Sequence, residues 1–337
     1  MEQKGTSINF LDRIKSNNIL KYIFKNIDEL QLLKIAKYNK ALQKKMGLSL
    51  NDYKIYSEIK SKIEIEIVAK WKGERYPSYF IKKYKENINY IHIYFNNDKI
   101  ETKRNYINEK EKVVKIKVII DKEILSFGHL FDFCRVIESI NFTKFYRKNI
   151  KDMSGMFMGC SSLKKLDLNN FNTINVTNMC AMFADCSSLK KLNLSTFITS
   201  KVSNMMRMFS GCSSLKELDL SNFETHKVND FDRMFESCIS LKKLNLLNFT
   251  TENVTAMPKM FYKCSSLEEL IYPNMFTYNC IFNEYMFGGC KSKLIDEVKK
   301  RYPDIYISGD VDEKYDEKYE EKFKDKNNEA VCECKIF

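Results

Sequence analysis

Glycine and histidine are scarce in this sequence, and neither is placed where catalysis would use it. The 337 residues include 10 Gly and 3 His, and the histidines stand far apart at positions 92, 129 and 226. No glycine-rich phosphate loop is present, and no histidine accompanies a nucleophile in a recognisable motif. A metal centre needs clustered ligands, which these histidines do not supply. We therefore expect no enzyme activity, no cofactor and no metal.

Long apolar segments are missing as well. Residues 1–15 lack the apolar stretch of a signal peptide, and nowhere do 18 apolar residues follow one another. The first feature argues against export by the signal-peptide route, and the second against a membrane-spanning helix. We therefore expect a cytoplasmic protein.

Charge is abundant but not concentrated. The formal net charge is +12, and the Lys and Arg residues are spread along the chain without a dense basic run. A positive balance of this kind favours acidic partners. No aromatic and basic motif of the common nucleic-acid-binding modules is present, so we expect no nucleic-acid partner.

One pattern is repeated through the middle of the chain. Of the 11 cysteines, seven recur at one constant interval, at positions 134, 160, 186, 212, 238, 264 and 290. A strict period of this length indicates a solenoid of stacked copies. Like positions in neighbouring copies are normally too far apart for a disulfide. We therefore interpret these cysteines as small buried hydrophobic residues with free thiols, in a reducing compartment.

Each copy predicts a helix followed by a short strand. Met153, Met156, Phe157 and Cys160 are spaced i, i+3, i+4 and i+7, which is one face of an α-helix. The residues ahead of this face are of types that cap helix N-termini, namely Thr177, Ser203, Asn229 and Thr255. The alternation in Leu166-Asp167-Leu168 is typical of a strand with its leucines inward. Neighbouring copies would share one core and pair their strands into a parallel sheet.

These repeats resemble those of a known family. Residues 156–168, MFMGCSSLKKLDL, and residues 171–173, FNT, are similar to the 26-residue "surface protein" repeat of the BspA-like leucine-rich repeat proteins. The resemblance covers about half of the chain and implies a non-enzymatic, protein-binding solenoid, often displayed on a cell surface. A cell-surface adhesin is therefore one alternative function.

Two features depart from that family. A leucine-rich repeat usually has Asn three residues after its second strand leucine, whereas this chain has Phe at 171, 197, 223 and 249. Surface members of the family also carry an export signal, and none is recognisable here.

Residues 1–60 have the pattern of a helical hairpin. Ile19, Leu20, Ile23 and Phe24 lie on one predicted helical face, and a second apolar segment surrounds Leu33. The hairpin is similar to an F-box, which docks substrate receptors onto a ubiquitin-ligase adaptor, although the usual opening proline is missing. The resemblance implies a second alternative function, a ubiquitin-ligase substrate receptor with that adaptor as partner. A plain helical cap is the other interpretation.

Residues 61–125 change to the period of strands. Residues 63–67, 90–95 and 113–120 are candidate strands in a small β-rich domain. Val114 and Ile116 also precede Ile140 and Phe142 by one full period of the repeat. We therefore expect this domain to begin the sheet and to cap the open end of the repeats at 126–290.

The C-terminal part contains a cap and a charged tail. Pro273 interrupts the strand pattern. Leu294, Ile295 and Val298 then predict an amphipathic helix in a cap spanning residues 291–308. Residues 309–337 are rich in Asp, Glu and Lys, and we expect disorder there.

The last four residues, Cys334-Lys335-Ile336-Phe337, resemble a prenylation box. The resemblance implies a lipid on Cys334, with Cys332 available for a second acyl chain. Such a protein would associate with the inner face of a membrane. Lys335 is not aliphatic, and the tail is acidic rather than polybasic, so lipidation is left open.

The candidate partner-binding residues flank the inward leucines of the predicted strands. They are Lys165, Asp167, Lys191, Asn193, Glu217, Asp219, Lys243 and Asn245. Beside them a row of lysines at 164, 190, 216 and 242 favours an acidic partner. The sequence thus predicts an α/β, leucine-rich-repeat-type solenoid of helix-strand repeats with helical and β-rich N-terminal caps. Its predicted function is that of a non-catalytic protein-interaction scaffold.

Overall fold

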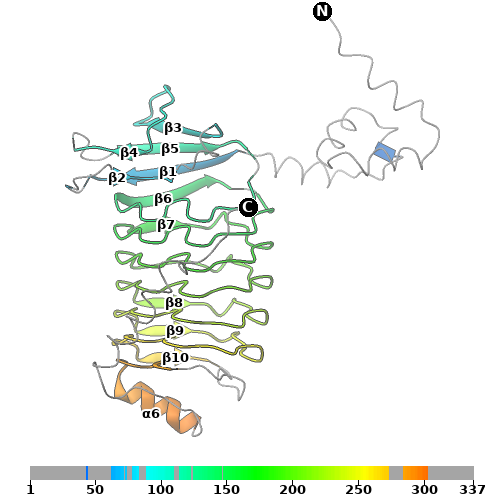
Figure 1. Ribbon diagram of the computed structural model, residues 1–337, viewed down its shortest axis with the longest axis vertical. Coiled ribbons are helices and arrows are strands. Elements are labelled where there is room, and N and C mark those ends of the chain that lie inside the picture. Colours follow the sequence, from blue (N-terminus) through cyan, green and yellow to red (C-terminus); the bar gives the residue numbers. More distant parts are fainter. Residues whose placement is uncertain are drawn as a thin grey trace, which may run out of the picture. The chain divides into compact units, whose positions relative to one another are not determined.

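The computed structural model describes one large part of the chain and two isolated residues (Figure 1). The described residues are 43–44, 62–71, 73, 78–82, 89–109, 114–122, 124–145, 147–272 and 284–302. The chain divides into two compact units, Met1–Ser61 and Lys62–Phe337. The F-box-like hairpin, apart from helical residues Gln43 and Lys44, lies outside the described residues. Pro273, Cys332 and Cys334 also lie outside them.

The second unit begins with the predicted β-rich segment. Its strands are β1 (Ile63–Ala69), β2 (Ser78–Tyr79), β3 (Ile91–Phe95), β4 (Tyr106–Ile107) and β5 (Val114–Ile120). Alternate residues of β1 and β5 are buried, as the period of two predicts. The three candidate strands at 63–67, 90–95 and 113–120 are therefore confirmed.

The place of β5 in the sheet differs from the prediction. The order is β3-β5-β1-β6-β7, so β1 lies between β5 and β6 (Ile137–Lys144). Ile67 of β1 faces Ile116 on one side and Ile140 on the other, and both pairings are antiparallel. The one-period spacing of Val114 from Ile140, and of Ile116 from Phe142, therefore did not mark adjacent copies. In every strand the inward residues recur at each second position, so the inward residues of any two strands can be found an even number of residues apart. The agreement with the repeat period therefore carried no information on which strands pair.

From β6 onward the copies lie side by side in the predicted register. Ile140 of β6 is opposite Leu166 of β7 (Lys165–Asp167), in parallel. A separate parallel sheet joins β8 (Glu217–Asp219), β9 (Lys243–Asn245) and β10 (Glu269–Ile271). Residues 191–193, between β7 and β8, form no strand. The predicted short strands are thus confirmed at β7, β8, β9 and β10 and are absent at residues 191–193.

The helix predicted in each copy is wrong. No helix is present in residues 124–145 or 147–272. The N–H groups of Met153 and Phe157 donate to carbonyls of the next copy, at Asn178 and Met182, both at 2.9 Å. Between them, the N–H of Met156 donates to the carbonyl of Met153, three residues back, at 3.3 Å. An α-helix would instead direct each N–H to the carbonyl four residues back.

Two left-handed residues, four positions apart, recur in these segments. In the copy at 153–160 they are Gly155 and Gly159, with φ of 55° and 68°, and in the next they are Ala181 and Asp185. A chain of tight turns with this alternation still points residues i, i+3, i+4 and i+7 inward. Met153, Met156, Phe157 and Cys160 are accordingly fully buried. The burial pattern was therefore predicted correctly from an incorrect local structure.

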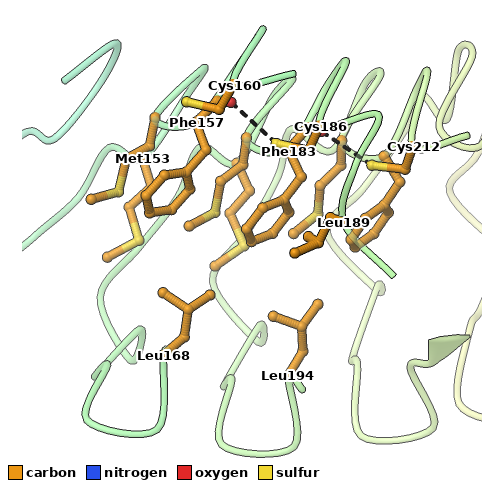
Figure 2. Packing of buried hydrophobic residues seen from close by; sticks show 14 of the residues in the cluster. Met153, Phe157, Cys160, Leu168, Phe183, Cys186, Leu189, Leu194 and Cys212 are labelled. Atoms are coloured by element: carbon orange, nitrogen blue, oxygen red, sulfur yellow. Dashed lines mark hydrogen bonds between the residues drawn. The ribbon is translucent and has the colours of Figure 1, made fainter. Parts of the chain in front are cut away.

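The core consists of identical side chains stacked from copy to copy (Figure 2). The ring centroids of Phe157 and Phe183 are 5.8 Å apart, and those of Phe183 and Phe209 are 5.6 Å apart. Of the Phe residues that replace the family's Asn, those at 171, 197 and 223 form a second buried stack, and Phe249 is buried against Phe231. Since stacked rings fill the core, this departure from the usual repeat is accommodated by packing.

The predicted helix caps have another role. The N–H of Thr177 donates to the carbonyl of Lys151 at 2.8 Å, and that of Ser203 to the carbonyl of Thr177 at 2.9 Å. These residues thus link neighbouring copies, and no helix follows them. The next residue, Asn178, accepts a bond through Oδ1 from the N–H of Cys180 at 3.1 Å, which closes a side-chain turn.

The described chain ends in the predicted amphipathic helix. Helix α6 (Ser292–Arg301) follows the last copies and buries Leu294, Ile295 and Val298, which confirms that element. No helix in the described part of the chain is both long and apolar enough to cross a bilayer.

Candidate interaction surfaces

The predicted partner-binding residues lie on the strand side of the copies, and most are exposed. Seven of the eight are exposed to solvent, and Asn245 is half-buried. The leucines between them point inward, and Leu218 and Leu244 are buried. The structure therefore brings the eight side chains onto one side, although β7 and β8 belong to separate sheets.

The Asp and Asn residues of this set stabilise the backbone. Oδ1 of Asp167 accepts a hydrogen bond from the N–H of Asn169 at 3.0 Å. The same bond recurs with Oδ1 of Asn193 and the N–H of Ser195 at 3.1 Å. It recurs again in the copies of Asp219 and Asn245. The bond from the Ser221 N–H lowers the pKa of Asp219, because it stabilises the carboxylate. Half of the predicted set thus closes side-chain turns.

At both ends of the strand side, lysines are paired with carboxylates. Lys164 Nζ lies 2.8 Å from Glu138, and Lys243 Nζ lies 2.8 Å from Glu269. The hydrogen bond that Lys243 donates to Glu269 raises the pKa of Lys243, because it stabilises the ammonium form. At the far end Lys291 pairs with Glu268, whose pKa is lowered by that hydrogen bond.

Between these pairs lies a group of unpaired cations. None of its members forms an ion pair within the described part of the chain, and all are exposed. We call this group the lysine patch: Lys165, Lys190, Lys191 and Lys216. The lysine patch spans three successive copies. Because neighbouring copies are about 4.8 Å apart, its first and last copies are separated by about 10 Å, and the positive potentials of the four lysines add over that distance.

Sequence reasoning missed a second surface, on the other side of the copies. One repeat position there changes from copy to copy, while the core positions keep their residue types. We call this position the variable row: His129, Gly155, Ala181, Arg207, Arg233, Lys259 and Tyr285. The signal was present in the sequence, because this position varies while the core positions of the same strict repeat keep their residue types.

The middle of this surface is apolar. Met158, Cys180, Ala181 and Ala184 form a buried cluster separate from the main core, with exposures of 2–8%, and Met206 packs against it. Cys180 is disulfide-bonded. We call these five residues the outer apolar cluster.

Beyond the outer apolar cluster the variable row contains Arg207, Arg233 and the buried Lys259, each beside acidic or aromatic side chains. Arg233 Nε lies 3.5 Å from Asp232, and its terminal nitrogen lies 3.6 Å from Glu236. Burial raises the pKa of Asp232 to about 6, although Arg233 acts in the opposite direction. Lys259 Nζ lies 5.2 Å from the ring centre of Tyr262 and 5.6 Å from that of Tyr285, in cation–π geometry.

The repeated cysteines take no part in either surface. All seven are free, and all but the half-buried Cys290 are buried. Each thiol from Cys160 onward donates to a carbonyl of the preceding copy, as Cys186 Sγ does to Phe157 at 3.2 Å (Figure 2). Burial raises the pKa of Cys212 to about 12, so this thiol is protonated and unreactive at neutral pH.

The described residues contain no group of three or more His, Cys, Asp or Glu arranged to hold a metal ion. The remaining arrangement consists of two extended surfaces on a regular backbone. Such surfaces are suited to contacts with another chain.

Sequence comparison identifies one family. The model described as "Mycoplasma protein of unknown function, DUF285" matches residues 125–219 and again residues 192–299. Together the two matches cover more than half of the chain and coincide with the repeated copies. No curated protein and no solved structure matches the chain.

Proposed function

We propose, from the premise that the chain belongs to the DUF285 family, that it is a non-catalytic scaffold which binds an acidic protein through its strand side. The copies form a leucine-rich-repeat-type solenoid of the BspA-like kind. In such a scaffold neighbouring copies hold one another, and the exposed positions are free to serve recognition.

The lysine patch carries this proposal. Lys190 and Lys191 lie at its centre, exposed and without a carboxylate partner among the described residues. Unpaired charges of one sign on successive copies produce a local positive potential that attracts an acidic surface. The paired lysines on either side, such as Lys164 and Lys243, limit the patch to the middle of the strand side.

A rigid backbone behind the patch favours binding, because fewer groups lose freedom when the partner docks. The buried hydroxyl of Thr199 donates to the carbonyl of Glu224 at 3.0 Å and accepts the N–H of the same residue at 2.8 Å. Thr225 makes the same pair of bonds to Thr250. These bonds lock the loops of adjacent copies together.

Crosslinking and mass spectrometry on the native protein tests the proposal. We expect partner crosslinks to concentrate on Lys165, Lys190, Lys191 and Lys216. The triple variant Lys190→Glu, Lys191→Glu, Lys216→Glu should weaken the recovered partner's binding at least about tenfold and reduce its salt dependence.

A matched control carries the same charge changes elsewhere. The variant Lys201→Glu, Lys227→Glu, Lys148→Glu alters three lysines outside the strands. If this control weakens binding as much as the patch variant, net charge rather than the lysine patch determines affinity, and the proposal is wrong. Circular dichroism should show the same fold for both variants.

A further inference from the structure

One repeat position on the strand side carries a charged residue in six successive copies. The four lysines at this position and the last glutamate are exposed, and the first glutamate is half-buried. We call these residues the charge row: Glu138, Lys164, Lys190, Lys216, Lys242 and Glu268. The charge row therefore consists of four cations with one carboxylate at each end.

Backbone hydrogen bonds place members of the charge row next to one another. The N–H of Lys164 donates to the carbonyl of Glu138 at 2.9 Å. The N–H of Lys242 donates to the carbonyl of Lys216 at 2.7 Å, and that of Glu268 to the carbonyl of Lys242 at 3.0 Å. Because neighbouring strands are about 4.8 Å apart, the side chains of the row leave the backbone at steps of about that length.

Lys190 keeps its place in the row, although its own N–H donates to no backbone carbonyl among the described residues. The hydroxyl of Ser187, three residues before Lys190, donates to the carbonyl of Ser161 at 3.3 Å. In the next copy the hydroxyl of Ser213 donates to the carbonyl of Ser187 at 3.4 Å. The copy of Lys190 is therefore stacked between its two neighbours in the common register.

The carboxylates at the two ends of the charge row already have partners. Glu138 pairs with Lys164 at 2.8 Å, and Glu268 pairs with Lys291. The hydrogen bond from Lys291, together with the charges of Lys291 and Lys242, lowers the pKa of Glu268. The positive potential of the row therefore falls toward both ends.

Three consecutive lysines of the row, Lys190, Lys216 and Lys242, form no ion pair within the described part of the chain. Two copy spacings separate the first from the third, which amounts to about 10 Å. An acidic partner that contacts all three therefore needs three carboxylates in a line of about that length.

An α-helix supplies such a line. Residues i, i+4 and i+7 lie on one face of a helix, and the first and last are about 10.5 Å apart along its axis. In an extended chain the side chains of one face recur at alternate residues, so three of them span about 13 Å. The third carboxylate of an extended segment would thus pass Lys242 by about 3–4 Å, toward Glu268. The long lysine side chains absorb the smaller mismatch of the helix.

We propose that the acidic partner docks an α-helix across the copies, with Asp or Glu side chains at i, i+4 and i+7 opposite Lys190, Lys216 and Lys242. The positions of that helix that face Glu138 and Glu268 are neutral or basic, because a further carboxylate there would be repelled. This inference rests on the proposed function and deepens it, since it names the structure and the charge spacing of the partner's contact.

Three synthetic peptides of equal net charge, titrated into the full-length protein at low salt, test the helix. The first is an Ala- and Gln-rich helix with Glu at i, i+4 and i+7. The second spreads the same three Glu around the helix, with equal helicity by circular dichroism, and the third places them at alternate positions of an extended, Thr-rich chain. Isothermal titration calorimetry should show that the first binds at least about fivefold more tightly than either of the others.

A double variant of the protein separates this inference from the proposed function. In Lys190→Glu, Lys216→Glu the first peptide should lose at least about tenfold in affinity, whereas the matched control Lys201→Glu, Lys227→Glu should retain most of it. If the first peptide is not the tightest binder but all three weaken in the double variant alone, the helix is wrong and the proposed function stands. If no peptide binds, or if the double variant and the control lose affinity equally, both are wrong.

Extending the charge row tests the spacing from the protein's side. Glu268→Lys adds a lysine after Lys242, so a helix with Glu at i, i+4, i+7 and i+11 should gain at least about threefold in affinity relative to the three-Glu helix. The control Glu224→Lys makes the same charge change in a loop outside the row and should leave the ratio of the two affinities unchanged. An unchanged ratio in Glu268→Lys, or an equal rise in the control, would overturn the inference.

Discussion

At the scale of single residues, the repeated cysteine is a packing residue with a specific hydrogen bond. Cys186 is fully buried, and its thiol donates to the Phe157 carbonyl of the preceding copy. Serine offers a similar bond but a more polar and smaller group. The sequence predicted the burial, because the cysteine lies on the apolar face. It did not reveal the acceptor, which lies 29 residues earlier in the chain.

We therefore expect Cys186→Ser to lower the free energy of unfolding by about 1–3 kcal/mol, because a polar hydroxyl replaces a sulfur in an apolar core. Urea denaturation followed by circular dichroism measures the change. Cys290→Ser, at the half-buried last copy, serves as the control and should cost less. An equal loss in the two variants would contradict the role of burial.

A second prediction at this scale concerns Asp232, whose pKa burial raises to about 6 from an ordinary 3.8. The folded state binds the proton more tightly than the unfolded state does. The stabilisation from Asp232 is therefore complete below pH 4 and is lost as the pH rises toward 6. Comparing urea unfolding of wild type and Asp232→Asn at pH 4, 5, 6 and 7 isolates this contribution. A difference that does not vary with pH would refute the shift.

At the scale of elements, one copy differs from the others on the strand side. β9 pairs with β8 and β10, whereas residues 191–193 belong to no strand. None of the N–H groups of residues 190–194 donates to a described backbone carbonyl, although Phe183 of the same copy still bonds to Met208 at 2.9 Å. The two sides of this copy therefore differ in local stability.

Hydrogen exchange should detect this difference. We expect the amides of residues 190–194 to exchange at least about tenfold faster than those of β9, because opening a residue without a ladder bond requires little free energy. Amides at 179–186 in the same copy should remain protected. Equal protection of 190–194 and β9 would show that the strand ladder is continuous in solution.

At the scale of the whole molecule, the contacts that hold neighbouring copies together depend on their register. Core rings stack on their equivalents in the neighbouring copy, and the buried cysteines and threonines bond to that copy's backbone carbonyls. A deletion of one full period brings equivalent positions together again, whereas a shorter deletion places polar residues against the core. Stability in such arrays depends mainly on contacts between neighbours.

We expect deletion of residues 219–244, which is one full period, to leave a cooperatively folded protein. Deletion of residues 219–240, which falls short of a period, should abolish cooperative thermal unfolding, because every later copy then loses its register with the earlier ones. Differential scanning calorimetry distinguishes the two. Loss of cooperativity in both deletions would show that the copies are not interchangeable units.

The sequence by itself determined the period, the inward positions, the strands at 63–67 and 113–120, and the apolar face of α6. Each of these depends on the order of polar and apolar residues within a short stretch. The exposure of the candidate partner-binding residues followed from the same alternation.

Only the tertiary structure decided the conformation between Met153 and Cys160 and the position of β1 between β5 and β6. In the first case the deciding bonds join Met153 and Phe157 to the next copy, so no local propensity encodes them. In the second, β1 pairs with β6 in antiparallel fashion, although the two segments are far apart in the sequence. Spacing within the sequence records which side chains face inward, whereas the backbone's bonding partners are set by which segments lie beside each other.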